Sequence, residues 1–141
     1  MSTNSNPTSQ KQWRIAGVTG LLAIAAIHGV DIPDKLSETS YIGWMYIGLV
    51  LASLALAAAL VFTKHHRLAW TAASGLAAAT FIGYCLSRTT GLPHANYDIG
   101  NWGEPLGIVS LIVEASVVVM AVSLLRREPR ESMNSLRTAQ E

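Results

Sequence analysis

Four long stretches of this chain are apolar, with charged residues confined almost entirely to their edges. They cover about residues 14–31, 41–63, 67–88 and 105–126, and each is long enough to cross the roughly 30 Å hydrocarbon core of a bilayer as a helix. Half of all residues are hydrophobic and only 13% are charged, which is typical of membrane proteins. The sequence therefore predicts an all-α fold: a four-helix transmembrane bundle with up-down topology, forming one domain at residues 13–127.

Both ends of the chain are polar. Residues 1–12 are rich in Ser, Thr, Asn and Gln, and residues 128–141 are similar. Because neither segment can bury much apolar surface, we expect a disordered cytoplasmic tail at 1–12 and a second cytoplasmic tail at 128–141. A cleaved secretory signal is not favoured, because the cleavage-like tripeptide at residues 23–25 lies inside the first apolar run.

Lysine and arginine are distributed unevenly between the two sides of the predicted bundle. Most lie near the chain ends or in the 64–67 turn, and only Lys35 and Arg88 lie on the other side. The positive-inside rule therefore places both termini in the cytoplasm. The lipid bilayer is the first expected partner. A net charge of +1 without a basic stripe indicates no nucleic-acid partner.

Glu114 is a carboxylate near the middle of the fourth apolar run. At that depth an ionisable group usually faces a protein interior or a wet cavity, and its small neighbours at helical spacing support an inward orientation. Desolvation disfavours the charged form, so we expect Glu114 to be neutral at neutral pH. Counting residues places Thr80 and Ser53 at the same depth as expected hydrogen-bond partners, with Ser110 above. A structural role, a proton relay or ligand contact, and an ion-ligand role all remain open.

A second polar group is expected where the outer ends of the helices meet. There the guanidinium of Arg88 either pairs with Glu104 or Asp98 or binds an anionic headgroup or carboxylate. No catalytic motif is recognisable, so we name no catalytic residue. The predicted ligand-binding or polar site consists of Glu114, His28, Arg88, Glu104, Asp98, Thr80 and Ser110.

Small residues four positions apart predict helix contact faces in membranes. The third run carries such a stripe at Gly75, Ala79, Gly83 and Ser87, and the second run carries Gly48 and Ala52. We expect these faces to pack closely against neighbouring helices.

Soft metal donors also lie toward the outer side. Imidazole, thioether and thiolate groups suit copper, although no fixed-spacing motif connects them here. The candidate metal ligands, with copper as the possible cofactor, are His28, His94, Met45 and Cys85.

A resemblance to a known family rests on two nearby segments, Ser87-Arg88-Thr89-Thr90-Gly91-Leu92-Pro93 and Glu104-Pro105-Leu106-Gly107. Together with Ile27-His28 and Pro33, they resemble a group of small, largely uncharacterised bacterial four-span integral membrane proteins with an "SRTxGLP…EPLG" outer loop. The resemblance covers about residues 20–125. It implies a location in the bacterial cytoplasmic membrane and groups His28, Arg88, Glu104 and Glu114 in one outward-facing site, but it implies no reaction.

Three functions are compatible with these features. The first is a non-catalytic accessory or interaction subunit that joins other membrane-protein subunits or self-associates. The second is an outer-face protein that binds or handles copper. The third is a small proton-coupled carrier or membrane enzyme that uses Glu114 as its titrating group. The first is favoured, and whether the protein is an enzyme stays open with a leaning against it.

Overall fold

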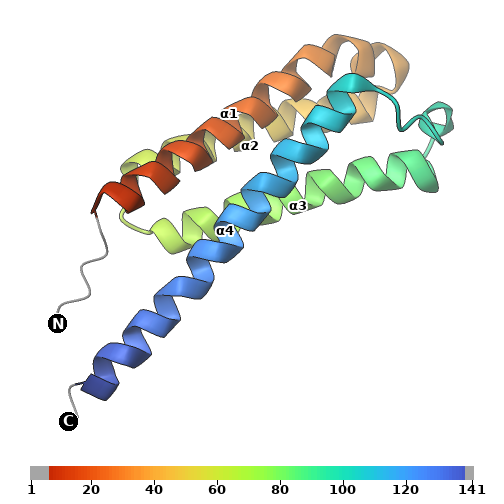
Figure 1. Cartoon of the computed structure of the whole chain (residues 1–141). Coiled ribbons are helices and arrows are strands. Elements are labelled where there is room, and N and C mark those ends of the chain that lie inside the picture. The colour runs from red at the N-terminus through yellow and green to blue at the C-terminus, as the bar shows by residue number, and fades with distance from the viewer. Residues whose placement is uncertain (1–6, 139–141) are drawn as a thin grey trace.

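The computed structural model describes residues 7–138, with side chains placed for residues 10–126. These residues form four α-helices and one short 3-10 turn, and the described part of the chain contains no β-strand (Figure 1). The elements are α1 (Pro7–Glu38), α2 (Ser40–Phe62), α3 (His66–Thr89), η1 (Asn96–Asp98) and α4 (Pro105–Thr138).

Each helix contains a segment long and apolar enough to cross a membrane. These segments are Gln10–Glu38, Ser40–Phe62, His66–Thr89 and Pro105–Arg126. The prediction of an all-helical chain with four helices long and apolar enough to span a membrane is thus confirmed for the described residues.

Helix boundaries differ from the sequence prediction at three places. Helix α1 begins at Pro7, inside the segment expected to be disordered, because proline suits the first turn of a helix, where its missing N–H is not needed. It also continues through Pro33 to Glu38, so Thr39 alone separates it from α2 instead of a loop. Helix α4 continues through most of the expected C-terminal tail, to Thr138. The remaining tail residues, 1–6 and 139–141, lie outside the described residues.

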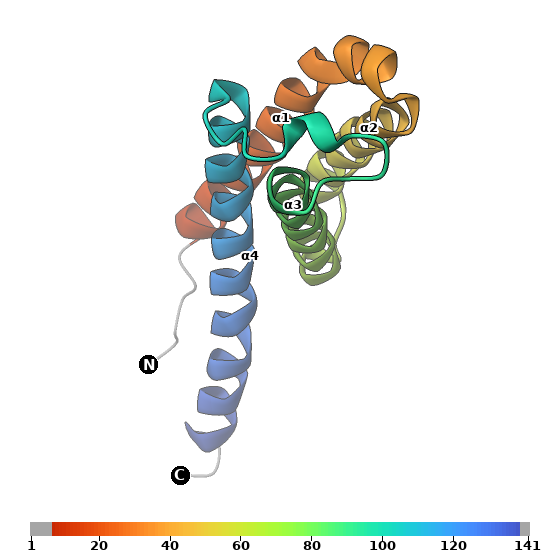
Figure 2. The ribbon, with the colours of Figure 1, turned by 90° about the vertical axis from the view of Figure 1, so that its right-hand side faces the viewer.

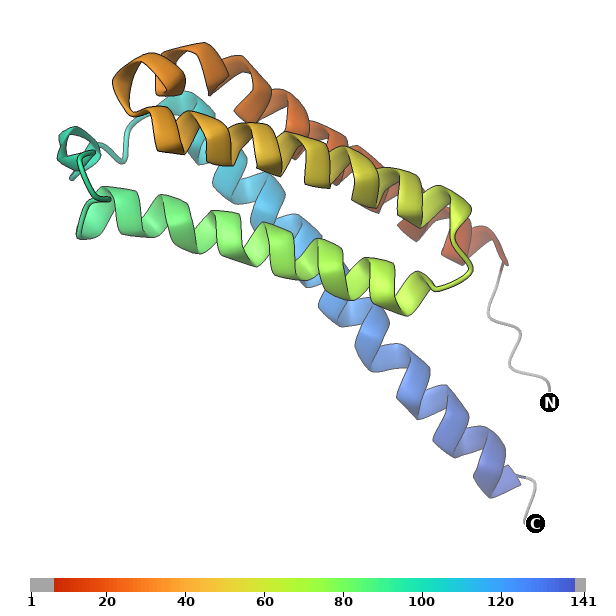
Figure 3. The ribbon, with the colours of Figure 1, turned by 180° about the vertical axis from the view of Figure 1, so that it is seen from behind.

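The four helices form a ring in which α1 packs against α2 and α4, and α3 packs against the same two helices (Figure 2). The α1–α2 junction and the loop containing η1 lie at one end of the molecule, which we call the loop end (Figures 1 and 3). The start of α1 and the α2–α3 turn lie at the other end. Beyond that end, α4 projects past the bundle (Figure 3).

The apolar core occupies the half of the bundle nearer the α2–α3 turn. It joins residues from all four helices: Leu21, Ile24, Ala57, Leu60, Ala69, Trp70, Ala73, Ala77, Val117 and Ala121. Gly17 permits a close approach here, because a Cβ at this position would overlap the Trp70 ring. The loop-end half instead buries polar side chains.

The expected contact face of α3 is wrong at Gly75 and Gly83, whereas Ser87 of the same stripe is buried. Its packed face carries Ala73 and Ala77, both fully buried. At Gly75 and Gly83, an added Cβ would meet nothing within 4 Å. Both stripes consist of small residues at helical spacing, so periodicity alone did not distinguish the packed face from the open one. The expected contact at Gly48 on α2 is also wrong, because its Cβ would likewise meet open space.

Candidate ligand cavity

A cavity of about 350 Å³ lies among the four helices in the loop-end half. Its wall is mostly apolar, and the glycines that leave open space on α2 and α3, Gly48 and Gly83, both line it. Its polar lining comes from all four helices and the η1 turn: His28, Asp31, Lys35, Tyr46, Thr80, Tyr84, Ser87, Arg88, Asp98, Glu104 and Ser110.

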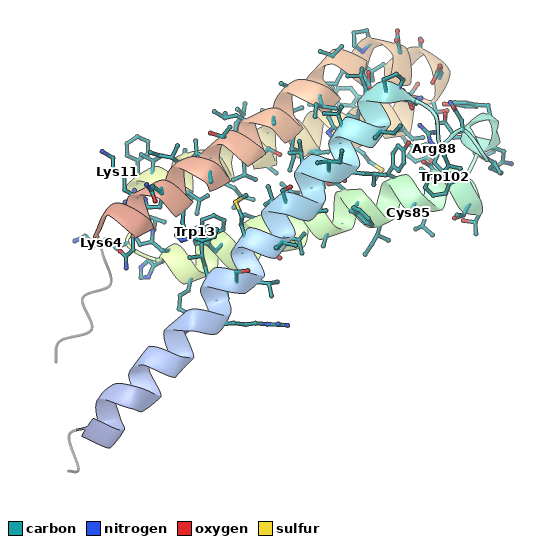
Figure 4. The ribbon with its side chains drawn as sticks, viewed as in Figure 1. Lys11, Trp13, Lys64, Cys85, Arg88 and Trp102 are labelled. Atoms are coloured by element: carbon teal, nitrogen blue, oxygen red, sulfur yellow. The ribbon has the colours of Figure 1, made fainter. Side chains whose placement is uncertain are left out.

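Arg88 organises the charged rim of this cavity. Its side chain is only 4% exposed and pairs with Asp98 at 2.7 Å and with Glu104. The guanidinium also lies over the Tyr84 ring, 4.6 Å from its centroid. Figure 4 labels Arg88 beside Trp102 at the loop end. The predicted pairing of Arg88 with Glu104 or Asp98 is confirmed, since both carboxylates are engaged.

Lys35 extends the same ionic cluster onto α1. Its ammonium lies 2.8 Å from Glu38 and 3.5 Å from Asp98, and 5.3 Å from the centroid of the Tyr97 ring. The hydroxyl of Tyr97 in turn donates to Glu38 at 3.0 Å. These contacts connect the end of α1 to the loop and, through Asp98, to Arg88.

Glu114 lies at the deep end of the polar half and is fully buried, as predicted. Its Oε1 accepts a hydrogen bond from Ser110 at 2.7 Å, one turn earlier on α4. The same oxygen lies 3.8 Å from Nε2 of His28, and Oε2 has no hydrogen-bond partner among the described residues. The carboxyl therefore sits behind Ser110 and His28, both of which line the cavity.

His28 is held in one orientation and one tautomer. Its Nδ1 lies 3.0 Å from the carbonyl of Ile24, and since a carbonyl only accepts, the neutral ring carries its proton on Nδ1. Nε2 then presents a lone pair toward Glu114. The ring also makes an edge-to-face contact with Tyr46, with centroids 4.9 Å apart.

Two expected partners of Glu114 are wrong. The hydroxyl of Thr80 lines the cavity but donates to the carbonyl of Leu76 at 2.9 Å. Ser53 is fully buried, and its hydroxyl has no partner among the described residues. The actual neighbours are Ser110, expected one level higher, and His28, expected at the outer mouth.

The metal candidates do not form a site. Among residues 10–126, whose side chains the structure describes, no group of three or more His, Cys, Asp or Glu residues is arranged to hold a metal ion. His28 is buried beside Glu114, whereas His94 lies in the loop, where it adopts a positive φ of 60°. Met45 is 63% exposed, and Cys85 lies on α3 (Figure 4). The structure therefore gives the copper hypothesis no support.

The predicted site lacked five polar lining residues: Asp31, Lys35, Tyr46, Tyr84 and Ser87. Asp31 and Lys35 follow His28 at spacings of three and seven, which place all three on one helix face. A prediction that continued the first helix through Pro33 would have placed Asp31 and Lys35 on the same face as His28.

Comparison of the chain with known proteins gives no functional evidence, because it matches no protein-family model, no curated protein and no solved structure.

Proposed function

We propose that this protein is a non-catalytic, multi-pass protein of the bacterial cytoplasmic membrane that binds a small molecule in the cavity among its four helices. The single observation that carries the proposal is the cavity itself. Its volume of about 350 Å³ lies within the range of small-molecule pockets, and it has an apolar wall and a few convergent polar groups. Such a protein would act as an accessory or interaction subunit whose partner or state depends on the ligand.

The orientation in this proposal follows from charge. Basic residues Lys11, Arg14, Lys64 and Arg67 gather toward the α2–α3 end, which the positive-inside rule assigns to the cytoplasm. Both termini are then cytoplasmic, and the loop end with the cavity faces outward.

Binding is favoured over catalysis because most of the polar groups around the cavity are held by protein partners, and the few that are not, such as the hydroxyl of Tyr84, are left for a ligand. Arg88 is paired with two carboxylates, and Ser110 donates to Glu114. Side chains held in place by such bonds can keep a ligand in one position, and the bonds account for the burial of these polar groups in an apolar bundle.

Two glycines on α3 provide a matched test of the cavity. Gly83 lines it and Gly75 does not, although a Cβ at either position would meet open space. Gly83→Leu should fill the cavity, whereas Gly75→Leu should add the same side chain elsewhere on the same helix. Both variants should fold, because leucine is the better helix former.

The assay is mass spectrometry of small molecules extracted from protein purified from its native membrane. We expect one compound in stoichiometric amount with the wild type and Gly75→Leu, and its loss from Gly83→Leu. Equal retention by the two variants, or no stoichiometric compound with the wild type, would contradict the proposal.

A second candidate function, a proton-coupled carrier, is favoured by one observation. Glu114 and His28 are both buried, and the histidine between the carboxyl and the cavity could relay a proton. In proteoliposomes under a pH gradient, Glu114→Gln should then abolish proton flux while leaving the protein folded. Unchanged flux in that variant would rule this function out.

A further inference from the structure

The cavity presents hydrogen-bond acceptors more readily than donors. Apart from the hydroxyls of Tyr46 and Tyr84, which can act either way, the neutral donors that line it already bond to protein oxygens. These bonds run from His28 Nδ1 to the carbonyl of Ile24 at 3.0 Å, from Ser110 to Glu114 at 2.7 Å, from Thr80 to the carbonyl of Leu76 at 2.9 Å, and from Ser87 to the carbonyl of Tyr84 at 2.7 Å. What remains for a ligand is chiefly lone pairs.

The charges of the lining also favour a cation. Both basic groups, Lys35 and Arg88, are paired with carboxylates, which compete with an anionic ligand for them; the Nε–H of Arg88 has no acceptor among the described residues, but that atom is buried. The lining contains three carboxylates against these two cations. Asp31 is the carboxylate that forms no ion pair among the described residues, and it is only half-buried.

Asp31 lies one helical turn beyond His28 on α1, and both line the cavity. Nε2 of His28 is 3.8 Å from Glu114, too far for a hydrogen bond, so its lone pair has no donor there. The ring of Tyr46 lines the same region, and aromatic faces attract organic cations. Two acceptors and an aromatic ring thus lie near one another in the lining, which is otherwise mostly apolar.

We propose that the cavity binds an organic ammonium compound with an apolar body, whose N–H groups bond to the carboxylate of Asp31 and to Nε2 of His28. This inference rests on the proposed function and specifies its ligand class. The apolar body of the ligand fills the space between α2 and α3 that Gly48 and Gly83 leave open.

The test uses three probes that share one apolar body: 4-phenylbutylamine, 4-phenylbutan-1-ol and 4-phenylbutyrate. Their affinities are measured by titration calorimetry on the full chain in lipid nanodiscs. We expect the amine to bind about tenfold more tightly than the alcohol, and the carboxylate to bind most weakly. Asp31→Asn should remove the advantage of the amine over the alcohol, and binding of the alcohol to the variant shows that the variant is folded.

Asp34→Asn is the matched control, since this carboxylate is exposed on the same helix and does not line the cavity. It should leave all three affinities unchanged. Equal binding of amine and alcohol, or an amine affinity insensitive to Asp31→Asn, would overturn the ammonium assignment while leaving a ligand cavity in place. If no probe binds, or if Gly83→Leu does not weaken binding, the ligand class and the proposed function both fail.

Discussion

Replacing Arg88 by methionine tests whether the ionic cluster holds the loop end together. Methionine keeps the length and apolar stem of the side chain but removes a guanidinium that is 4% exposed and bonded to Asp98 and Glu104. Removing one partner of a buried ion pair costs about 3–5 kcal/mol, because the other charge is left without compensation.

The exposure of the two carboxylates lowers the expected loss of stability. The side chain of Asp98 is 15% exposed and that of Glu104 is 35% exposed, so water can partly solvate both after the substitution. We therefore expect Arg88→Met to lower the free energy of unfolding by about 2–3 kcal/mol. Arg88→Lys keeps the charge but not the forked geometry, and should lower it by about 1–2 kcal/mol.

The assay is unfolding in mixed micelles with rising SDS fraction, followed by tryptophan fluorescence. A double-mutant cycle with Asp98→Asn should give a coupling energy of about 1–2 kcal/mol, since the two side chains are in direct contact. Lys64→Met removes an exposed cation in the α2–α3 turn and should change stability by less than about 0.5 kcal/mol. A cost for Arg88→Met no larger than that of Lys64→Met, or a coupling energy near zero, would refute the reasoning.

Three further substitutions can be measured by the same unfolding assay. Glu114→Gln should change stability by less than about 1 kcal/mol, because the amide oxygen can still accept the bond from Ser110; a loss above about 2 kcal/mol would contradict this. His94→Gly should stabilise the protein by about 0.5–1 kcal/mol, because the backbone there has a φ of 60°; a destabilised variant would show that the histidine side chain matters more. Gly107→Val should destabilise it by about 1–3 kcal/mol, because a Cβ there overlaps Tyr84, which is held under Arg88; unchanged stability would mean that the ring moves freely.

The sequence was sufficient to predict the helices but not the partners of Glu114. The length of an apolar run and its lack of charge identify a membrane-length helix. Both properties are read from the run itself, without knowledge of how the helices pack. The depth of His28 depended on where α1 ends, and the presence of Pro33 favoured an early end. Because α1 continues to Glu38, His28 lies more than two turns inside the helix and reaches Glu114.

Part of the charged rim of the cavity was also predictable from the sequence. Arg88 and Glu104 flank one loop and Asp98 lies within it, so their proximity follows from chain connectivity alone. Lys35 reaches Asp98, and Asp31 the cavity lining, only through the packing of α1 beside α4 and the loop. The cavity itself was not predictable, because small residues at helical spacing indicate a tight contact and an open space equally well.

The most direct test of the central claim is the chemical accessibility of the cavity from outside the cell. In a Cys85→Ala background, Gly83→Cys introduces a thiol on the cavity wall, and Gly75→Cys introduces one on the same helix away from the cavity. A membrane-impermeant thiol reagent added to intact cells should modify the cysteine at position 83. It should leave position 75 unmodified, because a thiol in lipid does not form the reactive thiolate. No modification at position 83, or equal modification at both positions, would contradict an outward-opening ligand cavity.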